Sequence, residues 1–358
     1  MENKILFIGF ELGSSRKEAV SINFKNHVNR VMSKGLQYRV YSLRSDKSFI
    51  THFLNTFKYL GDIYKIIKKE KITQVHDFFV LPAVSLLFAV PIKLRFPKVT
   101  LIKEIHNNFG FSKVVSMESF LRLLLSSKSS IRFLALVFNY VYSRSKYVSS
   151  LWKVKYIPQY IPIYRLSGRK TYVENNVSVC YLGHPLAKKG IGLFPEIIRR
   201  LDDNLKNKIV FNFAFSNIGN KVQIISEIKN KARTNNIKVR FQNNIEAFKF
   251  FRQNDIFILP LVDEHSATSV PNTVLEAMEA GCVVLANDNS IIRSVIKNGN
   301  NGILNTKLKA VDVINHLNSF TSSKTLITKL SSNSRKYIEL NHNLRYIREC
   351  FKEIYENK

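Results

Sequence analysis

The stretch 255–304 constrains the fold more than any other part of the chain, because it alternates strand and helix signals with polar hinges. Ile256 to Leu259 is an unbroken apolar run ended by Pro260, which is typical of a parallel strand buried on both faces. Pro271 then begins a helical pattern, and Gly281 follows its end. A buried strand followed by a helix of about three turns is therefore predicted here.

The second half of this stretch repeats the alternation. Residues 282–286 predict another apolar strand, 287–289 a turn, and Ser290 the cap of a helix that stops at residue 298. This β-α-β-α order predicts a parallel sheet, in which ligands bind beyond the carboxyl ends of the strands. The loops that follow the two strands, 261–270 and 287–289, are the candidate binding loops.

Glu276 is the strongest candidate for a ligand-binding carboxylate. The rest of its helical pattern is apolar, and Ala280 stands one turn further on, so no i,i+4 cation accounts for it. The alternative is a solvated glutamate favoured by the positive end of the helix. Both interpretations remain open on spacing alone.

The run PNTVLEAMEAG, followed by an apolar strand and a turn, resembles the donor-nucleotide signature of the retaining GT-B glycosyltransferases of the group 1 (GT4) family. This resemblance implies that Glu276 holds the ribose hydroxyls of a nucleotide-sugar, which a carboxylate can do by accepting two charge-assisted hydrogen bonds. It also implies that Asn272 and Thr273, at the start of the same helix, lie against the donor.

The family carries a further Glu eight positions earlier, where this chain has Thr268. Either the loop contains an insertion and Glu264, counted forward from Pro260, fills that role, or the hydroxyls of Thr268 and Ser269 have taken it over. We favour the insertion, with Glu264 as a catalytic residue.

A glycine loop upstream of this segment strengthens the resemblance. Residues 177–182 predict a strand, and the loop from Gly183 to Gly190 leads from it into a helix. Such a loop points backbone N–H groups at an anion, and a lysine adds a full charge. The loop resembles the family's GRLxxEKG phosphate clamp, with Lys189 in the Lys position and His184 in place of Arg. Gly183, His184 and Lys189 are therefore implied as diphosphate contacts.

The N-terminal half predicts another Rossmann-like unit. Residues 4–10 read as a strand that ends in a small-residue loop with Gly13, a candidate donor contact, although no G-x-G-x-x-G is present to indicate classical dinucleotide binding. His106 follows the strand predicted at 99–105. Either it makes a structural hydrogen bond, or it is a catalytic residue near the acceptor or the donor sugar. The resemblance implies the second role, because the corresponding strand of the family ends in a His. Further strands are predicted at 37–43 and 72–75.

Charge is distributed unevenly along the 358 residues. Residues 1–170 hold 29 Lys or Arg against 9 Asp or Glu, so +20 of the net charge of +29 lies there. Such a field attracts anionic lipid, a phosphorylated acceptor or nucleic acid, and the last is disfavoured because no nucleic-acid-binding motif is found. Three scattered cysteines argue against a disulfide framework or a zinc site and indicate a reducing compartment.

The segment 109–147 mixes basic residues with Phe, Leu and Tyr. One or two amphipathic helices packed on the sheet would explain it, and so would an interfacial helix on an anionic membrane. The N-terminal sequence reads as a first strand and has no signal-peptide pattern. The apolar stretch 78–92 is interrupted by two prolines and is too short to span a bilayer comfortably. The protein is thus expected in the cytoplasm, peripheral on the inner face of the cell membrane.

Together these features predict an α/β protein of GT-B architecture, two Rossmann-like domains facing a cleft. The predicted boundaries are 1–160 for an acceptor domain, 161–330 for a donor domain and 331–358 for a helical tail that crosses back, with a linker at 152–163. The implied function is sugar transfer from a nucleotide-sugar to a lipid-linked saccharide in surface-polysaccharide synthesis, without metal or cofactor. The alternatives are a nucleotide-sugar 2-epimerase and a non-catalytic anion-binding scaffold.

Overall fold

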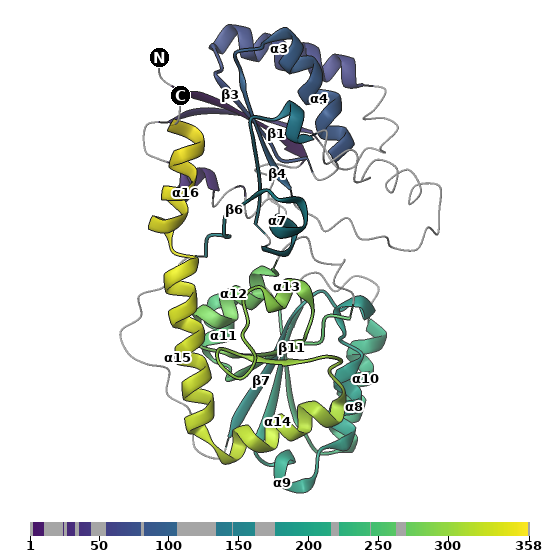
Figure 1. The fold of residues 1–358 in the computed structure, drawn as a ribbon. Helices are drawn as coiled ribbons and strands as arrows, with labels where there is room; N and C mark the ends of the chain where they lie inside the picture. Colours follow the sequence, from purple (N-terminus) through teal and green to yellow (C-terminus); the bar gives the residue numbers. More distant parts are fainter. Residues whose placement is uncertain are drawn as a thin grey trace. The chain divides into compact units, whose positions relative to one another are not determined.

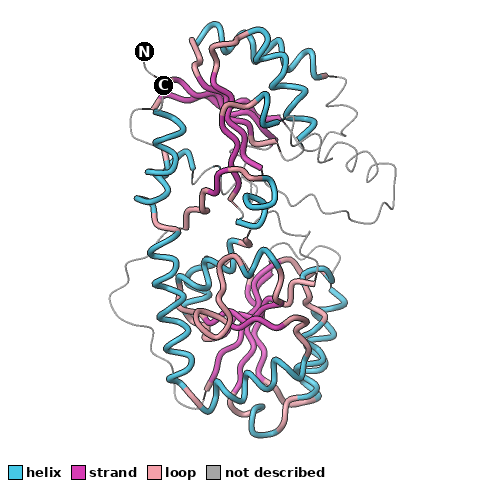
Figure 2. Tube along the Cα trace, in the orientation of Figure 1, coloured by secondary structure: helices cyan, strands magenta, loops and turns pink. Residues whose placement is uncertain are grey.

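The computed structural model describes residues 3–10, 24, 27–32, 36–43, 55–79, 82–105, 134–144, 146–161, 176–215, 222–243, 245–262 and 270–356. The chain divides into two compact units, each built on a parallel six-stranded sheet (Figures 1 and 2). Unit 1 comprises residues 1–160 and 344–358, and unit 2 comprises residues 161–343. The chain therefore leaves unit 1 after Tyr160 and returns to it at Leu344.

The sheet of unit 1 has the strand order β2-β1-β3-β4-β5-β6. Apolar residues on one face pack against helices α3 and α4, and those on the other face pack against η1 and α16. Its described strands and helices are β1 (Lys4–Phe10), η1 (His27–Val31), β2 (Gln37–Leu43), α3 (Thr56–Glu70), β3 (Gln74–Asp77), α4 (Pro82–Arg95), β4 (Thr100–Ile105), β5 (Tyr140–Ser143), α7 (Lys146–Trp152), β6 (Lys155–Tyr156) and α16 (Leu344–Glu356).

The sheet of unit 2 has the order β12-β11-β10-β7-β8-β9. Helices α8, α10 and α14 cover one face, while α11, α12, α13 and α15 cover the other. Its elements are β7 (Val177–Gly183), η2 (Ala187–Lys189), α8 (Leu193–Arg200), α9 (Asp203–Lys206), β8 (Ile209–Phe215), α10 (Val222–Thr234), β9 (Lys238–Gln242), α11 (Ala247–Arg252), β10 (Ile256–Leu259), α12 (Asn272–Glu279), β11 (Val283–Asn287), α13 (Ser290–Arg293), β12 (Ile303–Asn305), α14 (Ala310–Ser322) and α15 (Lys324–Asn341).

The stretch 255–304, whose strand and helix signals alternate, folds as β10-α12-β11-α13 and then β12. Strands β10 and β11 are buried because neighbours flank them on each side and helices cover both faces. Helix α12 is shorter than predicted, with eight residues, and Gly281 follows it at a φ of 79°, a left-handed conformation that glycine adopts at low cost. The predicted cap of α13 is wrong: the Asn289 side chain, not Ser290, accepts the Ile292 amide, at 2.9 Å. α13 also ends earlier, at Arg293.

Two predictions in unit 1 are wrong. Strand β3 begins at Gln74, so that His76 and Asp77 lie within the sheet rather than beyond it. Within the segment read as amphipathic helix, β5 is a parallel strand beside β4. The predicted linker does contain the boundary between the two units, after Tyr160, and its residues Lys155 and Tyr156 also form the edge strand β6.

Two further stretches are helical. The proline-interrupted apolar stretch overlaps α4, which begins at Pro82 and retains Pro91 within it. The basic C-terminal stretch forms two helices, α15 and α16. Over the ranges that are described, no helix is long and apolar enough to cross a membrane.

Candidate functional site

The two motifs singled out in the sequence lie beside each other in unit 2. The glycine loop follows β7, and α12 follows β10, and these two strands pair in parallel at the centre of the sheet. The chain proceeds from β7 outward to β8 and β9, then returns to the other side of β7 at β10. The loops after β7 and β10 therefore diverge from a topological switch point, where open parallel sheets bind their ligands.

Gly190 fixes the contact between these two loops. Its φ of 77° is left-handed, and a Cβ at this position would lie 1.9 Å from the carbonyl oxygen of Pro260, which directly follows β10. No side chain fits there. The glycine thus lets the loop after β7 pack directly on the backbone that leads out of β10.

The glycine loop is a series of tight turns. The Leu186 amide donates to the His184 carbonyl, and the amides of Lys189 and Gly190 donate to Leu186 and Ala187, each at 2.8 Å. The Tyr181 hydroxyl also donates to the His184 carbonyl, at 2.9 Å. These three amides are committed within the loop and cannot donate to an anion, whereas the charges of Lys189 and His184 can still attract one. His184 is exposed and Lys189 is half-buried.

The candidate donor contacts Asn272, Thr273 and Glu276 share one face of α12. All three are half-buried, whereas Val274, Leu275, Ala277, Met278 and Glu279 turn into the core. The spacing i, i+3 and i, i+4 brings their side chains together. The structure therefore places these three predicted residues as one polar surface on the helix that follows the switch-point loop.

Glu276 is held in an unusual electrostatic state. Burial raises the pKa of its carboxyl group from 4.5 to about 7, since desolvation penalises the charged form. No described side chain donates to this carboxylate. A half-buried carboxylate with a raised pKa gains most from a ligand that supplies hydrogen-bond donors, because such a ligand replaces the lost water.

The neighbouring loops of this sheet edge are tied together. The Asn287 side chain donates to the Leu261 carbonyl at 3.0 Å and accepts from the Leu308 amide at 2.7 Å. Asp288 forms a two-bond ion pair with Arg293, with both bonds at 2.8 Å. These links pre-organise the edge on which Glu276 and Lys189 stand.

Several predicted site residues lie outside the described residues: Gly13, His106, Glu264, Thr268 and Ser269. Gly183 ends β7, and a Cβ there would meet the Tyr181 side chain at an ordinary 3.4 Å. In the part of the chain that is described, no group of three or more His, Cys, Asp or Glu side chains could hold a metal ion.

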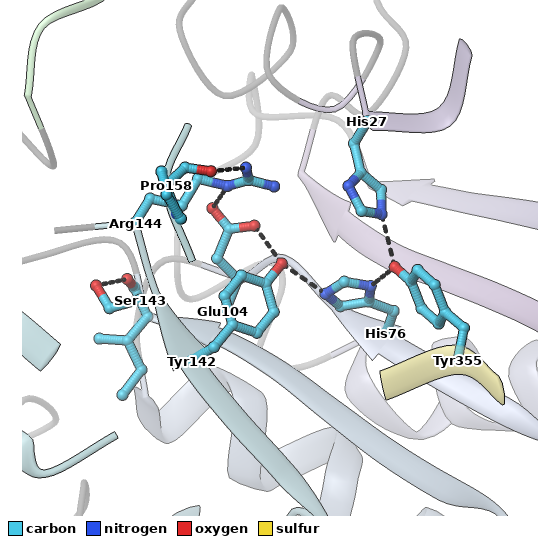
Figure 3. A network of polar contacts seen from close by, with 9 residues as sticks. His27, His76, Glu104, Tyr142, Ser143, Arg144, Pro158 and Tyr355 are labelled. Atoms are coloured by element: carbon cyan, nitrogen blue, oxygen red, sulfur yellow. Dashed lines mark hydrogen bonds and ion pairs between the residues drawn. The ribbon is translucent and has the colours of Figure 1, made fainter. Parts of the chain in front are cut away.

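A buried polar network in unit 1 is what sequence reasoning missed (Figure 3). Glu104 accepts from Arg144 Nε at 2.9 Å and from the Tyr142 hydroxyl at 2.6 Å. Because Tyr142 donates to Glu104, it must accept from His76 Nε2, which lies 3.0 Å away. Burial lowers the pKa of His76 well below 6.5 and so keeps it neutral, which makes its remaining ring nitrogen an acceptor.

The chain of hydrogen bonds continues in one direction to α16. Tyr355 donates to His76 Nδ1 at 2.7 Å, so it accepts from His27 Nε2 at 2.6 Å. Burial also lowers the pKa of His27 to about 3, so that both histidines are neutral. These side chains are 0–6% exposed and bind one another, so the network serves to hold α16 on the sheet.

Comparison with known proteins agrees with this architecture. Residues 176–321, most of unit 2, match the family model of group 1 glycosyl transferases. Unit 2 therefore carries a group 1 glycosyltransferase domain. No curated protein sequence matches the chain. This match confirms the prediction that the protein is a glycosyltransferase, and therefore an enzyme.

Solved structures extend the likeness to the whole chain. HepE from Anabaena in complex with UDP has a TM-score of 0.73 at 12% identity, with 99% of this chain and 100% of that one covered. Sucrose-phosphate synthase from Thermosynechococcus elongatus has a TM-score of 0.71 at 11% identity, covering 99% and 98%. A glycosyltransferase from Rickettsia africae has a TM-score of 0.70 at 15% identity, covering both chains fully. The predicted GT-B fold is confirmed.

Proposed function

We propose that the protein transfers a hexose-type sugar from a nucleoside-diphosphate donor to an acceptor hydroxyl. The proposal rests on Glu276. Its half-buried carboxylate receives no hydrogen bond from a described side chain. It lies beside the switch point of a group 1 glycosyltransferase domain. Two ribose hydroxyls would supply the missing donors as charge-assisted hydrogen bonds.

Uridine diphosphate is the nucleotide we propose first. HepE, which shares the fold, is described in complexes with UDP and with UDP-glucose. In this chain Lys189 would neutralise the diphosphate as the glycosidic bond breaks, with His184 as a weaker, pH-dependent partner. Because the charge on the leaving diphosphate grows in the transition state, Lys189 acts on turnover more than on donor binding.

The remaining steps of the proposal follow from the family resemblance. The transfer would retain the anomeric configuration, need no metal, and use Glu264 and His106, with Thr268 and Ser269 as the alternative to Glu264. Gly13 would contribute on the unit 1 side. These five residues lie outside the described ranges, so their roles are tested by substitution alone.

We propose a lipid-linked saccharide as acceptor and surface-polysaccharide synthesis on the inner face of the cell membrane as the setting. The excess of +20 in residues 1–170 supports a polyanionic surface as the partner of unit 1. The most basic stretch of the predicted membrane segment, residues 109–133, lies outside the described residues.

The donor is identified by a thermal-shift screen of the full-length protein against UDP, GDP, ADP, CMP and their sugars. A ligand at about a hundred times its Kd stabilises the protein by about 2.7 kcal/mol. Glu276→Gln should lose about half or more of this stabilisation, whereas Glu227→Gln, a substitution of an exposed glutamate on α10, should keep it. If no nucleotide shifts the melting temperature, the protein does not use a nucleotide-sugar donor, and a scaffold that binds another anion is favoured.

Product analysis then separates the activities. A transferase releases the nucleoside diphosphate in an acceptor-dependent manner, while a 2-epimerase converts the donor without any acceptor. If the protein binds the donor but catalyses neither reaction, it is a non-catalytic anion-binding scaffold.

A further inference from the structure

A basic surface with exposed leucines lies at one end of unit 1, where α3 and α4 end. We call it the leucine patch and define it by Lys68, Leu94, Arg95, Lys98 and Leu136. Leu94 and Leu136 are each 80% exposed, and the three cations are exposed and form no ion pair with any described residue. Large apolar side chains that stand this far into solvent among cations call for an explanation.

The fold brings these residues to the same edge of the sheet. Helices α3 and α4 lead into the paired strands β3 and β4, so both helices end at the amino edge of the sheet (Figure 1). The rings of Tyr64 and Phe96 meet edge to face, with centroids 5.4 Å apart. Arg95 is close enough for its charge to act on the pKa of Tyr64, and Lys68 stands one turn beyond Tyr64.

The Lys93 ammonium links Leu136 to this edge. It donates to the Val99 carbonyl at 3.5 Å and to Asn139 Oδ1 at 3.2 Å. Leu136 precedes Asn139 by three residues, on the short helical turn that leads to β5, and Leu94 follows Lys93 directly. Leu94 and Leu136 therefore lie one and three residues from the two side chains that this hydrogen bond joins.

Negative charge is scarce around the patch. Residues 82–103 and 134–156 contain no Asp or Glu. Glu70, at the end of α3, is paired with Arg39 at 2.7 Å. Cations near the carboxyl ends of α3 and α4 interact favourably with the negative ends of the helix dipoles, and this explains in part why Lys68 and Arg95 stand there. It explains neither Lys98, which lies beyond α4, nor the two leucines.

We infer that the leucine patch docks unit 1 on an anionic phospholipid bilayer. The leucines enter the boundary between headgroups and acyl chains, and the cations bind the headgroup phosphates. A nucleic acid fits less well, because the nearby aromatic rings of Tyr64 and Phe96 pack on each other rather than facing outward for stacking.

This inference deepens the proposed function by naming a surface of unit 1 that would hold the protein on the membrane, and it rests on that function only for its purpose. Binding is measured on the full-length protein by co-flotation with phosphatidylcholine vesicles, with and without phosphatidylglycerol, at low and high salt. Because neither donor nor acceptor is present, failure to bind vesicles leaves sugar transfer standing.

Two patch variants and one control are compared. Lys68→Gln/Arg95→Gln/Lys98→Gln should lower partitioning onto anionic vesicles by about a hundredfold, or about fivefold per cation. Leu94→Gln/Leu136→Gln should weaken the binding that survives high salt. The control Arg233→Gln/Lys238→Gln/Lys297→Gln removes the same charge from exposed positions of unit 2 and should bind like the parent protein.

Three results would overturn the inference. Equal loss in patch and control variants would show that net charge alone binds the vesicles. Binding that is unchanged in both patch variants would place the docking surface elsewhere. Patch-dependent binding to double-stranded DNA that exceeds binding to anionic vesicles would make the partner a nucleic acid. Thermal unfolding of each variant checks that these exposed substitutions leave the fold intact.

Discussion

Replacing His27 with Phe should remove an acid-sensitive element from unit 1. In the folded protein burial holds the pKa of His27 at about 3, against an ordinary value of 6.5. Below pH 6.5 His27 therefore binds a proton in the unfolded chain but not in the folded chain. Its contribution to the free energy of unfolding is complete above this pH and is lost as the pH falls. The loss is about 1.4 kcal/mol for each pH unit.

From about pH 7 to about pH 5 this one histidine should cost the parent protein about 2 kcal/mol of unfolding free energy. His27→Phe keeps a ring among Phe7, Phe78 and Phe351 and gives up the donation to Tyr355, at a cost of about 1 kcal/mol at neutral pH. The variant should thus be less stable near pH 7 and more stable near pH 5.

The assay is urea unfolding followed by the fluorescence of Trp152, the only tryptophan, which lies in α7 of unit 1. The other charged and titratable groups near His27 are Tyr355, His76, Arg144 and Glu104, and they are the same in both proteins. Their contributions therefore cancel in the difference between the two curves. An unfolding free-energy difference that does not change with pH would refute the neutral, buried His27.

Further substitutions test the donor site and its scaffold. Glu276→Gln should weaken UDP affinity by about 10- to 100-fold in calorimetry, because the ribose loses a charged acceptor, while the melting temperature of the free protein stays the same or rises. Lys189→Ala should lower kcat more than it raises KM in a steady-state transfer assay, and an effect on KM alone would remove it from the leaving group. His184→Arg should keep or raise activity at high pH, and an inactive, folded variant would contradict its place in the phosphate clamp. Gly190→Ala should destabilise unit 2 by more than about 1 kcal/mol in urea unfolding, since its φ is left-handed and Pro260 blocks the Cβ. An equally stable alanine variant would mean that the loop does not pack on β10 as described.

The sequence predicted unit 2 well because its strands are buried on both faces. Runs such as Ile256–Leu259 are apolar throughout, and proline, glycine and asparagine mark their ends. The Glu276 face of α12 could also be predicted, since a single carboxylate interrupts an apolar helical pattern. The cap of α13 could not, because Asn289 and Ser290 are adjacent and both are good capping residues.

Unit 1 was predicted less well because polar residues lie inside its sheet. Asp77 is buried in β3 and paired with Lys103 at 3.0 Å, so the end of the apolar run did not mark the end of the strand. In β5 the four residues Tyr140–Ser143 are too few to separate strand from helix periodicity. The network around His76 joins His27 to Tyr355, 328 residues apart, and no local pattern records such a contact.

Amide hydrogen exchange of the full-length protein, with and without saturating UDP, tests the central claim most directly. The claim is that the donor nucleotide binds at the switch point between β7 and β10 in unit 2. UDP should slow exchange in residues 183–193 and in the first turns of α12, and leave the amino edge of the sheet near 234–238 unchanged. Slowed exchange confined to unit 1, or none at a UDP concentration that saturates binding, would contradict the account.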